Sequence, residues 1–251
     1  MLLAANGFFS QAGLSNWGFR WLHILAGIVW IGLLYYFNLV QVPAFAEFDK
    51  VEGGARARNI ALDKVARRAL WWFRWAAVST FVTGILIAVT TSDYFKDKNA
   101  GFTAISMGML LGTIMLLNVW GVIWRNQKVV LANAATVVGG GAANPDAPAA
   151  GRRAFMASRQ NVIFSVSMLF FMVFKTHSPY AADAPGNKAI FWIVGLIVVA
   201  ILEVNALGFM PWKTAPKKGL NVLYESVQNV LIAAFGLWVI FLIISEVGLT
   251  A

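Results

Sequence analysis

The sequence of 251 residues contains no cysteine. This absence excludes disulfide bonds, iron–sulfur clusters, thiolate metal sites and the Cys-x-x-Cys-His attachment of c-type haem. Charged residues are also scarce, at 12% of the chain, whereas soluble proteins have about 25%. There are only two histidines, and a catalytic zinc ion normally needs three protein ligands. The sequence therefore argues against a soluble enzyme and against the common zinc sites.

Apolar residues take the place of the missing charge. They make up 59% of the chain, and the mean hydropathy is +0.70. Several apolar runs have about 20 residues, the length that crosses a hydrocarbon layer of about 30 Å as a helix. We predict an all-α integral membrane protein, with one membrane domain over residues 1–251 and six transmembrane helices. The expected helices cover residues 17–45, 69–91, 103–130, 160–176, 188–209 and 223–247.

The basic residues fall mainly in alternate loops between these helices. The first, third and fifth loops hold fourteen of the 20 lysines and arginines. By the positive-inside rule these loops face the cytoplasm, which makes both termini periplasmic in a multi-pass protein of the bacterial inner membrane. The same rule explains the net charge of +9 without nucleic acid as a partner. The segment RRALWWFRW, residues 67–75, is typical of an interfacial belt at the cytoplasmic boundary.

The third loop differs in composition from the rest of the chain. It contains ANAATVVGGGAANPDAPAAG, a run of alanine, glycine and proline. Such a composition cannot bury a core and is typical of linkers. We predict a flexible cytoplasmic linker at residues 133–158, between the first three helices and the last three.

The two histidines fall at the same expected depth. His23 lies near the outer end of the 17–45 helix, and His177 lies at the outer end of the 160–176 helix. Two imidazoles near one face of the membrane could be the axial ligands of a b-type haem, which needs no cysteine. The alternative is that both rings bond water in the headgroup layer.

The neighbours of the histidines suit the same interpretation. Gly27 and Trp30 follow His23 at four and seven residues, so the three share one helical face, and Gly27 leaves room for a flat ring. Arg20 and Lys175 lie close to the two histidines in the sequence and could pair with haem propionates. Both cations also fit a simpler role, as snorkelling side chains that anchor their helices.

A second group of polar residues lies toward the cytoplasmic half of the expected bundle. An ionisable group within a span, such as Glu203, is costly and suggests a proton or transport path. The competing explanation is that these amides and carboxylates hydrogen-bond between helices and hold them together. The group contains Asn118, Glu203, Asn205, Glu225, Gln228 and Asn229, which Asn38 could join.

Four segments resemble a known family. RWLHILAGIVWIGLLYYFN, WWFRWAAVSTFVTG, LNVWGVIWRNQK and SMLFFMVFKTHSP are similar, in this order, to the membrane domain of the bacterial urate oxidases that carry a cytochrome c tail. The match is closest to their small, tail-less relatives. The first segment also resembles the opening helix of the membrane-type protoporphyrinogen oxidase, in which the residue matching His23 is a haem ligand.

The resemblance implies a redox membrane protein that holds haem b. We therefore predict a haem b-binding electron-transfer protein, a candidate membrane oxidoreductase, whose electron partner is a separate cytochrome c or a quinone. The Trp-rich flanks and the GMLLG segment, residues 108–112, favour a homo-oligomer. Two alternatives stay open: a haem-free structural or accessory oligomeric membrane protein, and a transporter or proton path around Glu203.

Overall fold

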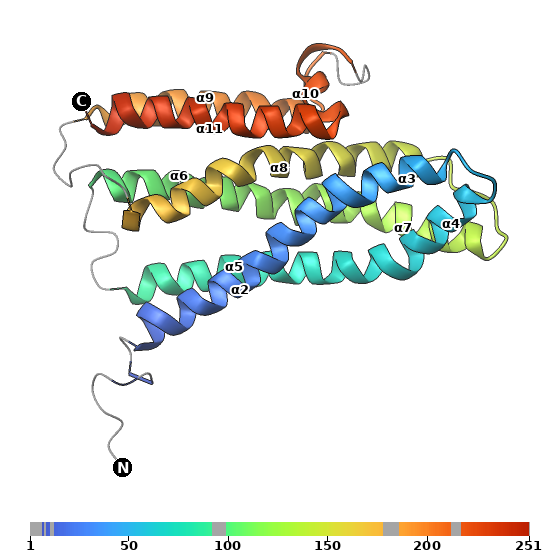
Figure 1. Cartoon of the computed structure of the whole chain (residues 1–251), viewed down its shortest axis with the longest axis horizontal. Helices are drawn as coiled ribbons and strands as arrows, with labels where there is room; N and C mark the ends of the chain where they lie inside the picture. Colours follow the sequence, from blue (N-terminus) through green and yellow to red (C-terminus); the bar gives the residue numbers. More distant parts are fainter. Residues whose placement is uncertain are drawn as a thin grey trace.

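The computed structural model describes residues 7, 9–10, 13–91, 99–177, 186–211 and 217–250, without the side chains of residues 15, 16, 175 and 176. The described residues form helices and short connections, and no strand occurs among them (Figure 1). Six of the helices are long and apolar enough to cross a membrane. The prediction of an all-α membrane protein with six spanning helices is confirmed.

The first three spans are continuous helices that contain π-helical turns. The first span is preceded by η1 (Leu14–Gly18) and consists of α2 (Phe19–Tyr35), η2 (Tyr36–Gln41) and α3 (Val42–Phe48). The second consists of α4 (Gly54–Ala61), η3 (Leu62–Ala66) and α5 (Arg67–Thr90). The third consists of α6 (Ala100–Leu117), η4 (Asn118–Ile123) and α7 (Trp124–Val138).

The last three spans are α8 (Ala147–His177), α9 (Lys188–Ala206) and α11 (Val227–Leu249). The short helices η5 (Gly219–Asn221) and α10 (Val222–Glu225) lead into α11. Polar side chains cap several of these helices, because the first backbone N–H groups of a helix lack partners within it. The Ser226 hydroxyl accepts from the N–H of Asn229 at the start of α11, and Asn99 caps α6 in the same way.

The connection between α7 and α8 is shorter than the predicted linker. α7 continues to Val138 and α8 begins at Ala147, so only residues 139–146 lie outside helices, rather than 133–158. Alanine is the best helix former, and Ala150, Ala154 and Ala157 are buried in the first turns of α8. The alanines therefore lengthen a helix instead of making a linker. The cytoplasmic location of this connection stays a prediction.

α8 is the central helix of the bundle. Its most apolar window is 67% buried, against 28–39% for the other five spans. α8 packs against α6, α7 and α11, whereas α2 packs mainly on α5, and α9 packs on α11. In Figure 1, α5 and the α9–α11 pair lie on opposite sides of α6 and α8. This arrangement leaves α2 and α9 with one wide face toward lipid.

The basic loops gather at one end of the bundle. The start of α2 and the end of α11 lie at one end, while the α3–α4 turn, the α7–α8 connection and α10 lie at the other (Figure 1). The basic residues of those connections therefore share one membrane face, as the sequence predicts. That this face is cytoplasmic stays a prediction.

The GMLLG segment packs inside the chain. A Cβ atom on Gly108 would lie 2.9 Å from the Cβ of Phe171 on α8, and one on Gly112 would lie 3.9 Å from Cγ of Met168. These glycines let α6 and α8 approach closely, as small residues do between membrane helices. The segment is thus unavailable to a contact between copies, and the predicted homo-oligomer loses this support.

Candidate functional site

His23 faces α5 near one end of the bundle. Its Nδ1 lies 2.8 Å from the backbone oxygen of Thr80 and 3.2 Å from Oγ1 of Thr83. The Thr83 hydroxyl itself donates to the Ser79 carbonyl oxygen at 2.6 Å. Because both oxygens therefore act as acceptors, Nδ1 carries the hydrogen of the neutral ring. The lone pair of the imidazole is then on Nε2, and no described residue donates a hydrogen bond to it.

Two glycines shape the contact between α2 and α5 at this site. A Cβ on Gly84 would lie only 3.2 Å from Cε1 of His23, so the glycine makes room for the imidazole ring. A Cβ on Gly27 would lie 3.9 Å from Cγ2 of Thr80, an ordinary contact. His23 and Gly27 thus share the face toward α5, as their spacing predicts. The space beside Gly27 is filled by α5.

The remaining residues predicted around the histidines occupy different environments. Trp30 is buried in the core at 2% exposure, and its indole nitrogen has no hydrogen-bond partner among the described residues. Arg20 and His177 are exposed, and Nδ1 of His177 lies 3.4 Å from the Val173 carbonyl oxygen of its own helix. The side chain of Lys175 lies outside the described residues. The ends of α2 and α8 that carry the histidines lie at the same end of the bundle (Figure 1).

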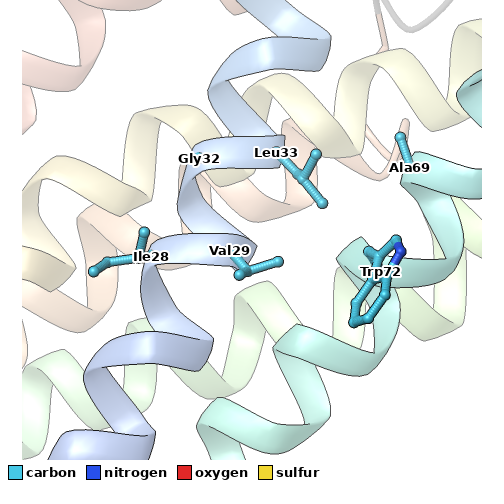
Figure 2. A pocket seen from close by; sticks show the side chains of 6 residues that line it. All are labelled: Ile28, Val29, Gly32, Leu33, Ala69 and Trp72. Carbon is cyan, nitrogen blue, oxygen red and sulfur yellow. The ribbon is translucent and has the colours of Figure 1, made fainter.

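An apolar groove runs between α2 and α5, away from His23. It has a volume of about 490 Å³ and is lined by Ile28, Val29, Gly32, Leu33, Ala69 and Trp72. Figure 2 shows Val29 of α2 pointing toward Trp72, which forms the facing wall on α5. No ionisable side chain lines the groove. It therefore fits lipid chains and offers no group for chemistry.

Some of the polar residues predicted in the cytoplasmic half join a network centred on α8. The Asn118 amide donates to Oδ1 of Asn161 at 3.0 Å and to Oε2 of Glu203 at 3.2 Å. The Asn161 amide donates in turn to the Met115 carbonyl oxygen at 3.0 Å. These bonds join α6, η4, α8 and α9 across the middle of the bundle. Asn118 and Glu203 therefore meet, as their expected depth suggests.

A second part of the network ties α10 to α8. The Tyr224 hydroxyl donates to Oε1 of Gln160, and the Tyr224 carbonyl oxygen accepts from Nη1 of Arg159 at 2.9 Å. Burial raises the pKa of the Tyr224 hydroxyl, so it remains a neutral donor. Arg152 holds Glu225 through two hydrogen bonds, of 3.2 and 2.5 Å. This part of the network connects charged groups that would otherwise be isolated at the membrane boundary.

The other predicted members bond elsewhere. Asn205 donates to Oδ1 of Asn221 at 3.2 Å, and Asn229 donates to the Val222 carbonyl oxygen at 2.8 Å. Gln228 is exposed. Asn38 lies in η2 and donates to the Leu34 carbonyl oxygen and to Oγ of Ser158, both at 2.8 Å. The predicted group thus divides into several local sets, and Asn118 and Glu203 are two predicted members that bond directly to each other.

Several residues of both sites were not predicted. Thr80, Thr83 and Gly84 stand at the spacing of one helical face within the segment STFVTG, which is a visible signal for a contact surface. Gln160 and Asn161 are adjacent amides at the point where α8 becomes strongly apolar. Neither signal names the partner helix, because that depends on how whole helices pack.

A comparison with protein families matches most of this architecture. The family described as urate oxidase N-terminal matches residues 85–239, which is more than half of the chain. The chain belongs to the urate oxidase N-terminal family. Neither the curated proteins nor the solved structures contain a match.

The family match and the His23 site cover different parts of the chain. The urate oxidase N-terminal match begins within α5 and ends within α11, so it contains Asn118, Glu203 and His177. His23, Thr80 and Gly84 precede it. The network around α8 therefore belongs to the region that defines membership of the urate oxidase N-terminal family, and the interpretation of His23 rests on its geometry.

Proposed function

We propose that this chain is a haem b-binding redox protein of the membrane, related to the membrane domain of urate oxidase, and that His23 is an iron ligand. The observation that carries the proposal is the hydrogen bond of 2.8 Å between Nδ1 of His23 and the Thr80 carbonyl oxygen. In haem and metal sites a ligating histidine commonly donates its other ring N–H to a carbonyl or carboxylate group. That bond fixes the tautomer and the direction of the ring.

The chain's own residues prepare the ligand in three ways. Thr80 and Thr83 hold Nδ1 as a donor, which leaves the Nε2 lone pair for iron. Gly84 admits the ring next to α5 without a clash. The surrounding helices exclude water from one side of the ring, which is half-buried. A bound haem b would supply one-electron chemistry, and a separate cytochrome c or a quinone would exchange the electron.

The proposal gives the other predicted residues supporting roles. His177, at the end of α8, is the second axial ligand, and its ring is exposed at the end of the bundle where α2 begins. Arg20, exposed in the first turn of α2, and Lys175 are the propionate partners. No group of three or more His, Cys, Asp or Glu side chains that could hold a metal ion occurs among the described residues.

An absorption spectrum of the purified protein, oxidised and reduced, tests the proposal. We expect a coloured protein with a low-spin spectrum and a sharp reduced α-band. His23→Ala should lose most of the haem, because it removes the oriented ligand. His177→Ala is the matched variant: it should retain haem in a five-coordinate form that binds carbon monoxide. A colourless wild-type protein, produced with ample haem, would instead favour the haem-free accessory function.

A second candidate function rests on Glu203. Its carboxylate accepts a hydrogen bond from Asn118 within the spanning part of the bundle, where an ionisable group is costly. A carboxylate in such a place can take up and release a proton, and so form part of a proton or transport path. The same hydrogen bond also holds α9 to η4, and the two roles make different predictions for a Glu203→Gln variant.

A further inference from the structure

Arg74 is a buried cation of α5 that forms no ion pair with a carboxylate of the described residues. Its side chain is 7% exposed, and its guanidinium carbon lies 3.4 Å from the centre of the Trp124 ring and 5.9 Å from that of Trp120. Within the described part of the chain, Nε and Nη1 of Arg74 are buried and have no hydrogen-bond acceptor. Aromatic faces stabilise such a cation partly, but they leave its N–H groups unsatisfied.

Three carboxylates near this end of the bundle are paired with other cations. Asp63 is bonded to Arg67 and Lys64 at 2.6 and 2.7 Å. Glu225 is paired with Arg152, and Asp49 is paired with Arg58. Among the described residues, therefore, no acidic side chain forms an ion pair with Arg74. A buried guanidinium without an anion is strongly unfavourable, so an anion from outside the chain would stabilise it.

A second residue with an unsatisfied donor lies beside Arg74. The indole Nε1 of Trp120, in the π-helical η4, is also buried without an acceptor among the described residues. Guanidinium and indole N–H groups both donate, and a planar guanidinium suits the oxygens of a phosphate or carboxylate. The three orphaned donors from α5 and η4 thus have the chemistry of an oxyanion site.

The position of Arg74 in the membrane indicates where the oxyanion comes from. Trp71, Trp72 and Trp75 flank it in the sequence of α5 and are 48%, 60% and 46% exposed, which is typical of the interfacial belt at headgroup level. Arg67 stands seven residues earlier, about 10 Å further out along the helix. At this depth the abundant oxyanions are the phosphate groups of lipids.

We propose that Arg74, Trp120 and Trp124 form a binding site for the phosphate group of an anionic phospholipid. The guanidinium and the Trp120 indole donate to the phosphate oxygens, and the Trp124 ring holds the guanidinium in place. Trp75 contacts Trp120 with ring centres 5.7 Å apart and is half-exposed, so its side chain is the one that moves to admit the headgroup. The inference is independent of haem.

Titration of the purified full-length protein in a neutral detergent tests this site. The probes are short-chain phosphatidylglycerol, short-chain phosphatidylcholine and inorganic phosphate. Native mass spectrometry and thermal unfolding measure the binding of each. Wild-type protein should bind phosphatidylglycerol in preference to the other two. Arg74→Gln should weaken that binding about ten- to hundredfold, the range expected when hydrogen bonds to a charged group are lost.

Arg68→Gln is the matched control, because it removes one positive charge from an exposed side chain of the same helix. It should keep the preference for phosphatidylglycerol. Two further variants should each weaken binding by a smaller factor. Trp120→Phe removes only the indole donor, and Arg74→Lys keeps the charge without the planar guanidinium. Both variants test the site even if Arg74→Gln does not fold. Equal binding of the two lipids by wild-type protein would overturn the proposal. So would binding of inorganic phosphate as tight as that of phosphatidylglycerol, which would assign the site to a soluble anion.

Discussion

α8 and α2 show how differently two spanning helices of one bundle can be used. α8 is the less apolar of the two by sequence. Yet 67% of its spanning segment is buried inside the protein, against 28% of the span that contains α2. In a bilayer the apolar side chains can face lipid at no cost, whereas amides and hydroxyls need partners inside the protein. The polar helix therefore takes the centre, and the apolar helix takes the edge.

The same contrast separates the two candidate sites. Around α8 the polar side chains bond to one another, as in Asn118–Asn161, although Nε of Arg159, Nε2 of Gln160 and Oγ of Ser167 are buried without a partner among the described residues. On α2, His23 bonds through one nitrogen only, to α5. A ring whose second nitrogen is unused suits a ligand, while amides that bond from helix to helix suit a scaffold. The comparison assigns stability mainly to α8 and binding mainly to the α2–α5 pair.

The largest expected effect is on the packing of α8. Gly108→Val places a side chain where a Cβ already lies 2.9 Å from the Cβ of Phe171, and should lower the free energy of unfolding by about 3 kcal/mol. Gly32→Val on α2 is the control, because no atom lies within 4 Å of its added Cβ. It should change the stability by less than about 1 kcal/mol. Unfolding in mixed micelles measures both; equal losses would show that α8 is not the special helix.

The next effect concerns the binding side of the comparison. Gly84→Val should displace the His23 ring, since a Cβ there lies 3.2 Å from Cε1, and should weaken haem binding about 10- to 100-fold. Gly27→Ala, whose Cβ makes only an ordinary contact with Thr80, should retain haem. Haem content per protein, together with the unfolding midpoint, separates ligand loss from misfolding. Haem retained in full by Gly84→Val would place the ligand elsewhere.

A smaller loss of stability is expected in the network itself. Asn161→Leu replaces the amide by an apolar side chain of similar length. The Asn118 amide and the Met115 carbonyl oxygen then have fewer hydrogen-bond partners. The free energy of unfolding should fall by about 1–2 kcal/mol, at the upper end of hydrogen bonds measured between membrane helices. Val166→Ala, at a half-buried apolar position of the same helix, serves as a control for local packing. An unchanged stability in Asn161→Leu would mean that the amide contributes no net hydrogen-bond energy.

The sequence indicates some of these features and hides others for physical reasons. Six spans and one basic end follow from apolar length and charge, which act residue by residue. The contact between Glu203 and Asn118 follows from equal depth. The hydrogen-bond partner of His23 cannot be predicted in this way. The packing of whole helices places Thr80 of α5 beside His23. The helical start of α8 could not be predicted either, because a segment rich in alanine, glycine and proline is typical of linkers. The contact of Arg152 with Glu225, which lies far away in the sequence, helps to hold this segment as a helix in the bundle.

The smallest effect on stability should come from Glu203→Gln. The amide oxygen of glutamine still accepts from Asn118, and removal of a charge lowers the cost of burial, so the fold and any haem should be retained. The change in the free energy of unfolding should be within about 1 kcal/mol.

If Glu203 carries protons, the variant loses proton-dependent activity or proton uptake in reconstituted vesicles while its stability is unchanged. Asn118→Leu provides the complementary test, because it removes the hydrogen bond and leaves the carboxylate able to titrate. A Glu203→Gln protein that is clearly less stable but keeps its proton uptake would mark Glu203 as a link between α9 and η4. The contrast between a scaffold around α8 and a site on α2 would then hold for the whole bundle.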